Sequence, residues 1–187
     1  KKMEKLCGSK VSMVFQDPML TLNPTIPVGK QITEAIIKNQ KVSRDEARKK
    51  SCGNAEAGRN SGCRTALWPA ASFFSGGMRQ RCVLAIALAC DPEILFADEA
   101  TTALDATVEA KILDLLLELR EKTGISIVFI SHDLGAVARI ADRVAVMYAG
   151  KIIEIGTAEE VYYDPRHPYT WGTSVFSVLY LQVKKGS

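Results

Sequence analysis

The sequence lacks any apolar run long enough to cross a membrane, and it lacks a strong charge of either sign. Its most apolar stretch, residues 82–90, reads CVLAIALAC. That is far shorter than the roughly 20 residues that a transmembrane helix needs, and its length suits a buried helix. The N-terminus has no apolar segment of the secretory type. The net charge of +3 gives no argument for nucleic acid or an anionic membrane as a partner.

Cysteine shows no ordered spacing. The five cysteines do not have the spacing of zinc ligands, and an odd number is atypical of a disulfide framework, so we expect reduced thiols, as in the cytoplasm.

The chain has 187 residues, of which 47% are hydrophobic and 24% are charged. This length and composition are typical of one globular domain with a sizeable core.

Short apolar runs alternate with segments of helical period. The runs KVSMVF, EILFA and ISIVFIS predict strands over residues 10–15, 93–97 and 125–131. The last of these is continuously apolar, as in strands buried on both faces of a parallel sheet. The predicted helices cover residues 28–39, 78–89, 105–122 and 134–141. The alternation predicts an α/β fold with a mainly parallel sheet.

Two capping boxes predict further helix starts. Ser43 is followed by Glu46, and Thr157 is followed by Glu160, the spacing at which each side chain can satisfy the other's backbone N–H. Residues 51–73 differ from the rest, because neither the helical nor the strand period can be followed through them.

Polar residues follow three of the predicted strands. Gln16 comes after the first, Asp98 and Glu99 after the second, and His132 after the third. Because ligands bind beyond the carboxyl ends of parallel strands, we expect one common site. There, Asp98 could hold Mg²⁺ through its water shell, and Glu99 could orient or deprotonate an attacking water. His132 could donate to a terminal phosphate, and Gln16 could reach metal and water.

Ser75, Gly76 and Gly77 precede the predicted helix over residues 78–89. Glycines let a ligand approach the backbone, and the N–H groups and dipole of a helix start favour an anion. An isolated Ser-Gly-Gly is usually an ordinary helix cap, so its meaning depends on the motifs around it.

In chain order these motifs are VFQDP, FSGGMRQR, ILFADEATTALD and ISHDLG. Their order and spacing closely resemble the ATP-binding subunits of ABC transporters. LNPT over residues 22–25 and YDPRHPYTWG over residues 163–172 are similar to the oligopeptide, dipeptide and nickel importer branch of that family. The resemblance covers residues 10–50 and 74–172.

The resemblance implies a role for each matching residue. Gln16 would be the Q-loop residue, Asp98 the Walker B ligand of Mg²⁺, Glu99 the catalytic glutamate and His132 the switch histidine. The signature residues, which would bind ATP held by a partner subunit, are Ser75, Gly76, Gly77 and Gln80. The D-loop residues are Ala103, Leu104 and Asp105.

The resemblance also implies an incomplete RecA-like P-loop ATPase core with a helical subdomain. The expected divisions are core and Q-loop in 1–17, helical subdomain in 18–89, second core part in 90–156 and C-terminal extension in 157–187. Two subunits would sandwich ATP and Mg²⁺, and the Q-loop region would contact a membrane permease. The protein would be cytoplasmic and peripheral on the inner face of the cell membrane, with no contact to nucleic acid or to the transported substrate.

The sequence departs from the family in four places. The phosphate-binding motif G-x-x-x-x-G-K-[ST] is absent, so we expect an N-terminally truncated chain with weak or absent ATP binding and an unpaired sheet edge. Ala100 stands where the family usually has proline. Codons for residues 53–73 can be chosen so that a shifted frame gives a family-like sequence, and we therefore interpret 51–73 as translated out of frame. The tail after Gly172 also departs from the family.

Two other interpretations stay open. The missing motif and the irregular segment favour a non-catalytic remnant, or a module that binds a permease or a partner subunit. DNA-repair ATPases also carry SGG signatures, but they have long coiled-coil insertions, and no heptad pattern occurs here.

Overall fold

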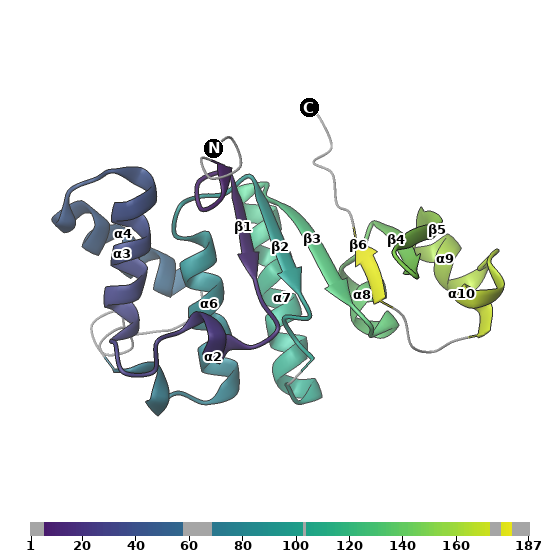
Figure 1. Ribbon diagram of the computed structural model, residues 1–187, viewed down its shortest axis with the longest axis horizontal. Coiled ribbons are helices and arrows are strands. Elements are labelled where there is room, and N and C mark those ends of the chain that lie inside the picture. The colour runs from purple at the N-terminus through teal and green to yellow at the C-terminus, as the bar shows by residue number, and fades with distance from the viewer. Residues whose placement is uncertain (1–5, 58–68, 103, 173–176, 181–187) are drawn as a thin grey trace.

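The structure is a computed structural model that describes residues 6–57, 69–102, 104–172 and 177–180 (Figure 1). Its centre is a sheet with strand order β1-β2-β3-β6-β4-β5. The first three strands, β1 (Val11–Val14), β2 (Ile94–Asp98) and β3 (Ser126–Ser131), pair in parallel. This half has the parallel sheet that the alternation of strands and helices predicted.

The other half of the sheet is antiparallel. β6 (Ser177–Tyr180) pairs with β3 on one side and with β4 (Arg143–Tyr148) on the other, and β4 pairs with β5 (Lys151–Thr157). β4 and β5 form a hairpin whose turn residues Ala149 and Gly150 have φ of 47° and 75°. The sheet is therefore parallel in one half only, and a tail segment for which no strand was predicted lies in its middle.

Three helices follow the parallel strands. α6 (Gly76–Leu88) packs against β1, α8 (Leu134–Ile140) packs against β3, and α7 (Ala106–Thr123) contacts both α6 and α8. The predicted end of α7 is confirmed, because Gly124 adopts φ 67° and its N–H donates to the Arg120 carbonyl at 2.9 Å.

The core lies between these helices and the strands. The largest fully buried side chains come from both layers and include Leu95 of β2, Ile127 and Phe129 of β3, and Ile112, Leu115 and Leu116 of α7. The continuously apolar run of β3 is thus explained, because its central residues are buried on both faces. Among the described residues, no helix has both the length and the apolar character of a membrane span.

A helical region lies to the left of the sheet in Figure 1. It contains α2 (Pro18–Thr21), α3 (Val28–Gln40), α4 (Arg44–Ala57) and the short 3₁₀ helix η1 (Ala71–Phe73). The capping box that begins α4 is confirmed: Ser43 N donates to Glu46 Oε2 at 3.1 Å and Glu46 N to Ser43 Oγ at 3.3 Å.

α4 extends into the segment for which no helical period was found. Ser51 is buried, and its Oγ donates to the Arg48 carbonyl at 2.8 Å and accepts from Thr33 Oγ1 of α3 at 3.4 Å. This polar contact with α3 holds a turn that apolar periodicity could not reveal. Residues 58–68, the middle of the segment interpreted as out of frame, lie outside the described residues.

At the other end of the molecule, β5 leads into α9 (Ala158–Tyr163) and α10 (Pro168–Gly172). The second capping box is confirmed, with Glu160 N donating to Thr157 Oγ1 at 3.1 Å and Thr157 N donating to Glu160 Oε2 at 2.8 Å. Glu154 of β5 accepts from the backbone N–H groups of Arg166 and His167 at 2.8 and 3.2 Å, which fixes the loop before α10.

Candidate active site

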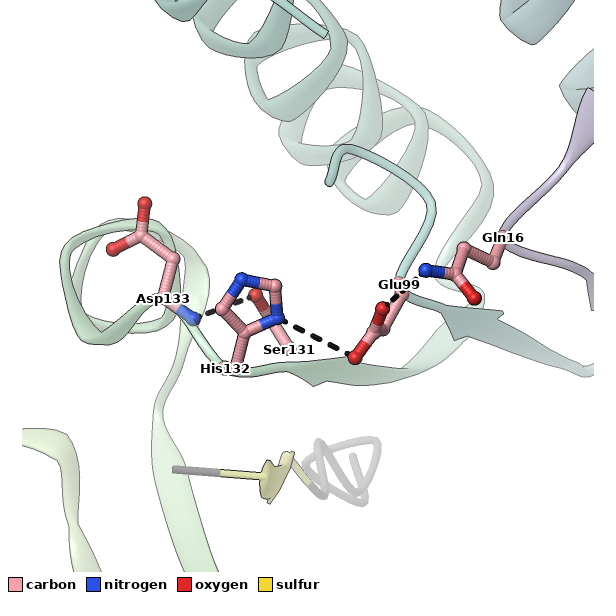
Figure 2. A network of polar contacts seen from close by, with 5 residues as sticks. All are labelled: Gln16, Glu99, Ser131, His132 and Asp133. Atoms are coloured by element: carbon pink, nitrogen blue, oxygen red, sulfur yellow. Dashed lines mark hydrogen bonds and ion pairs between the residues drawn. The ribbon is translucent and has the colours of Figure 1, made fainter. Parts of the chain in front are cut away.

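Three of the predicted site residues meet at the carboxyl ends of adjacent parallel strands (Figure 2). Gln16 follows β1, Glu99 follows β2 and His132 follows β3. Gln16 Nε2 donates to Glu99 Oε2 at 2.7 Å, and His132 Nδ1 lies 3.4 Å from Glu99 Oε1. Each oxygen of the Glu99 carboxylate therefore faces a different strand end, and the structure brings together the three positions that the sequence pointed to.

The backbone at Glu99 turns sharply. Its φ is 46°, a left-handed value that is uncommon for a residue with a side chain. The Glu99 N–H donates to the Ile130 carbonyl at 2.9 Å, and the Glu99 carbonyl accepts from Thr102 N–H at 3.2 Å. Ala100 and Thr101 are both 2% exposed and anchor the turn below the site. Unfavourable backbone angles of this kind persist where surrounding contacts fix them, and they cluster at functional sites.

His132 is held by the cap of the next helix. Asp133 Oδ1 accepts from the N–H groups of Gly135 and Ala136 at 2.7 and 3.3 Å, and Asp133 N–H donates to Ser131 Oγ at 3.0 Å. These bonds fix the backbone on both sides of the histidine. The His132 side chain remains 44% exposed and that of Glu99 28% exposed, so solvent reaches both.

Asp98 is the last residue of β2, directly before Glu99, and is partly buried. Its Cα pairs with that of Ile130 across the sheet. A carboxylate here and the amide oxygen of Gln16 are oxygen donors of the kind that Mg²⁺ accepts alongside phosphate and water.

Three of the four predicted signature residues lie at the start of α6. Ser75 is the N-cap, and its Oγ accepts from Met78 N–H at 3.4 Å. Ser75 and Gly76 are exposed and Gly77 is partly buried. Gln80 differs from these three: it is only 1% exposed, so its amide lies inside the protein and not on the surface at the helix start.

Of the predicted D-loop residues, Leu104 and Asp105 are described and Ala103 lies outside the described residues. Asp105 is the N-cap of α7, with its Oδ1 accepting from Val108 N–H at 3.0 Å. Leu104 Cδ2 lies 3.9 Å from the position that a Cβ on Gly76 would take.

Some supporting residues were not identified from the sequence. Asp133 is a capping residue directly before the apolar start of α8, a signal that could have been recognised. Ser131 has no such signal, because its hydroxyl only orders the turn that follows β3. The close packing of Gly77 against α7 depends on the tertiary structure and had no signal in the sequence.

Comparison with known proteins defines the class. The ABC transporter family model matches residues 1–102, more than half of the chain. The chain therefore belongs to the ABC transporter family.

Individual relatives narrow the comparison. The oligopeptide transport ATP-binding protein OppD of Bacillus subtilis (strain 168) is 53% identical over 172 residues, which cover 92% of this chain and 48% of the relative. The dipeptide transport ATP-binding protein DppD of the same organism is 52% identical, covering 92% of this chain and 51% of the relative. The chain thus spans about half the length of these relatives. The glutathione import ATP-binding protein GsiA of Escherichia coli (strain K12) is 45% identical over 90% of this chain and 27% of the relative.

Solved structures confirm the fold. The chain matches cbiO1 from Clostridium perfringens, part of the ABC transporter complex cbiONQ, with a TM-score of 0.76 and 28% identity over 87% of this chain and 61% of that one. It matches the ATP-binding cassette MJ0796, in a dimeric post-hydrolysis state bound to ADP and Pi, with a TM-score of 0.72 and 26% identity over 84% and 66%. The α/β fold expected from the sequence is that of an ABC ATPase cassette.

Proposed function

We propose that this protein is the ATP-binding and ATP-hydrolysing subunit of an ABC importer for peptides. The observation that carries the proposal is the Glu99 carboxylate, positioned between Gln16 and His132 at the strand ends of an ABC cassette. The names of the relatives OppD and DppD support peptides as the transported class. The protein would energise uptake through a membrane permease, from the inner face of the cell membrane.

Glu99 would orient or deprotonate the water that attacks the terminal phosphate. The Gln16 amide donates to one carboxylate oxygen and the His132 ring approaches the other, so the carboxylate cannot rotate freely. A general base acts on a water within hydrogen-bond reach, and the partial exposure of Glu99 leaves room for one. His132 contacts Glu99 through Nδ1, so Nε2 is the ring nitrogen left to face the phosphate, and donation through both nitrogens requires the doubly protonated ring.

Asp98 and Gln16 would hold the magnesium ion that accompanies ATP. Mg²⁺ takes few protein ligands and keeps phosphate oxygens and waters, so one carboxylate and one amide oxygen suit it. When bound, the ion would neutralise charge on the phosphate oxygens. Ser75, Gly76 and Gly77 of one subunit would contact the ATP held by a second subunit, through backbone N–H groups at the start of α6.

The Q-loop segment would form the surface that contacts the permease. Its LNPT sequence makes a well-bonded turn: Asn23 Oδ1 accepts from Thr25 N–H and Oγ1 at 3.0 and 2.8 Å. Gln31 of α3 accepts from Asn23 N–H at 2.9 Å and donates to the Asn23 and Ile26 carbonyls at 3.0 and 2.8 Å. A preformed surface loop of this kind suits the docking of a partner.

A second candidate is a non-catalytic subunit that binds the permease and a catalytic partner. The exposed start of α6 and the bonded turn at residues 22–25 would serve such a subunit equally well, because neither of them involves the Glu99 carboxylate. The two candidates differ in one consequence: only the catalytic subunit needs the Glu99 carboxylate.

Peptide uptake by cells that lack their own OppD-type subunit tests the proposal. We expect the protein to restore uptake of a labelled tetrapeptide, and Glu99→Gln to abolish the restoration at equal protein levels. Restoration by both proteins would favour the non-catalytic subunit. Restored nickel uptake without peptide uptake would contradict peptides as the substrate class.

A further inference from the structure

The two glycines at the start of α6 have different surroundings. Both belong to the first turn of the helix, and neither has a positive φ. The backbone conformation therefore does not require glycine at either position.

The space around each glycine differs sharply. A Cβ at Gly76 would have Leu104 Cδ2 as its nearest neighbour at 3.9 Å, an ordinary van der Waals distance. A Cβ at Gly77 would lie 2.5 Å from Val108 Cγ1, much closer than real Cβ atoms approach. Gly77 is thus required by contact with α7, whereas Gly76 is not.

Val108 cannot easily move away from that contact. It is β-branched and lies in the first turn of α7, where one side-chain rotamer is strongly preferred. Its backbone is fixed as well, because its N–H donates to the capping oxygen of Asp105 at 3.0 Å. The other side of the contact is the capped start of α6, where Met78 N–H donates to Ser75 Oγ.

We infer that Val108 is a positioning residue that sets the distance between the start of α6 (Ser75–Gly77) and the start of α7 (Leu104–Asp105). Its methyl group occupies the space of a Cβ at Gly77, so the two helix starts meet at one fixed separation. Only the consequence of this contact for hydrolysis depends on the proposed function. A shift of α7 would act through the contact of Val108 with Gly77 and displace the backbone N–H groups that face the partner's nucleotide.

Thermal melts of the purified protein test the contact without nucleotide. Gly77→Ala should lower Tm by about 3–10 °C, because overpacking a fixed contact is destabilising. Gly76→Ala is the matched control, and should raise Tm by about 1–3 °C, since alanine has the smaller entropy cost in a helix. The double variant Gly77→Ala/Val108→Ala should recover most of the loss. Equal Tm values for the two single alanine variants, or no recovery in the double variant, would overturn the inference.

Hydrogen exchange and hydrolysis test positioning itself. Gly77→Ala should speed amide exchange at both residues 76–79 and 106–109, and adding Val108→Ala to it should reverse this. Faster exchange in α6 alone would contradict the coupling.

At millimolar Mg-ATP, kcat should fall at least 10-fold in Gly77→Ala and recover in the double variant. A double variant that is stable but inactive would overturn the positioning role. Absence of hydrolysis in every variant, wild type included, would contradict the proposed function, and melts and exchange would still decide the role of Val108.

Discussion

The chain has two histidines, and each lies beside a glutamate, but the two pairs are built for different purposes. In the parallel half of the sheet, Glu99 accepts from the Gln16 side chain and faces the His132 ring. In the antiparallel half, Glu154 accepts from the backbone N–H groups of Arg166 and His167. Side-chain partners orient the first carboxylate, whereas the second carboxylate accepts backbone N–H groups and holds the chain. The topology, more than the residue types, decides which pair lies at the carboxyl ends of parallel strands.

Phe129→Ala should have the largest effect. It tests whether the two halves of the sheet share one core. Phe129 is fully buried in β3, the strand that links them. The substitution should cost about 3–5 kcal/mol of unfolding free energy, from lost burial and the cavity left behind. Chemical denaturation followed by circular dichroism measures this. One cooperative transition is expected, and two separate transitions would show that the halves unfold independently.

His132→Ala should lower the rate of ATP hydrolysis by about 100-fold or more, because the proposed function makes its ring a donor to the phosphate. Its matched control is His167→Ala, in the other half of the sheet. The side chain of that residue accepts from Tyr169 N–H at 3.1 Å through Nδ1, a contact within its own loop. Phosphate release per folded molecule should therefore be unchanged in the control. Similar losses in both variants would erase the distinction between the two pairs.

Glu154→Gln should change how stability depends on pH. Burial raises the pKa of the Glu154 carboxyl, but the Arg166 N–H, the Thr170 side chain and the His167 N–H together outweigh it and hold the pKa below the ordinary 4.5. A lowered pKa in the folded state adds stability that is complete above the ordinary value and is lost as pH falls through the lowered one. In melts from pH 7 to pH 3, the variant should be less stable at neutral pH. The difference from wild type should shrink below about pH 4.5. A constant difference at all pH values would contradict this.

Thr157→Ala should have the smallest effect. It removes the capping hydroxyl at the start of α9 and should cost about 1 kcal/mol, or about 2–4 °C in Tm. Thr157→Ser keeps the hydroxyl and should retain most of the stability. Phosphate release should be unaffected by either variant, since α9 belongs to the antiparallel half.

The candidate site was largely predictable because parallel strands place their carboxyl ends together. Once Gln16, Glu99 and His132 were each assigned to a strand end, their convergence followed from the order of the sheet. Helix ends were predictable for a similar local reason, since capping residues such as Ser43, Asp105 and Thr157 act within one turn.

Features that rest on distant contacts were not predictable. The position of β6 between β3 and β4 depends on pairing between residues that lie at least 30 positions apart in the sequence. The extension of α4 depends on the buried contact of Ser51 with Thr33, and the burial of Gln80 depends on how α6 packs. Such contacts leave no period in the sequence, so propensity and spacing could not reveal them.

Phosphate release at millimolar Mg-ATP, compared between the wild-type protein and Glu99→Gln, tests the central claim most directly. High nucleotide concentration keeps weak binding from hiding the chemical step, so the comparison reports kcat. We predict measurable release by the wild type and a loss of about 100-fold or more in the variant, with equal Tm values for the two proteins. Equal rates of release would contradict the assignment of Glu99 as the residue that acts on water.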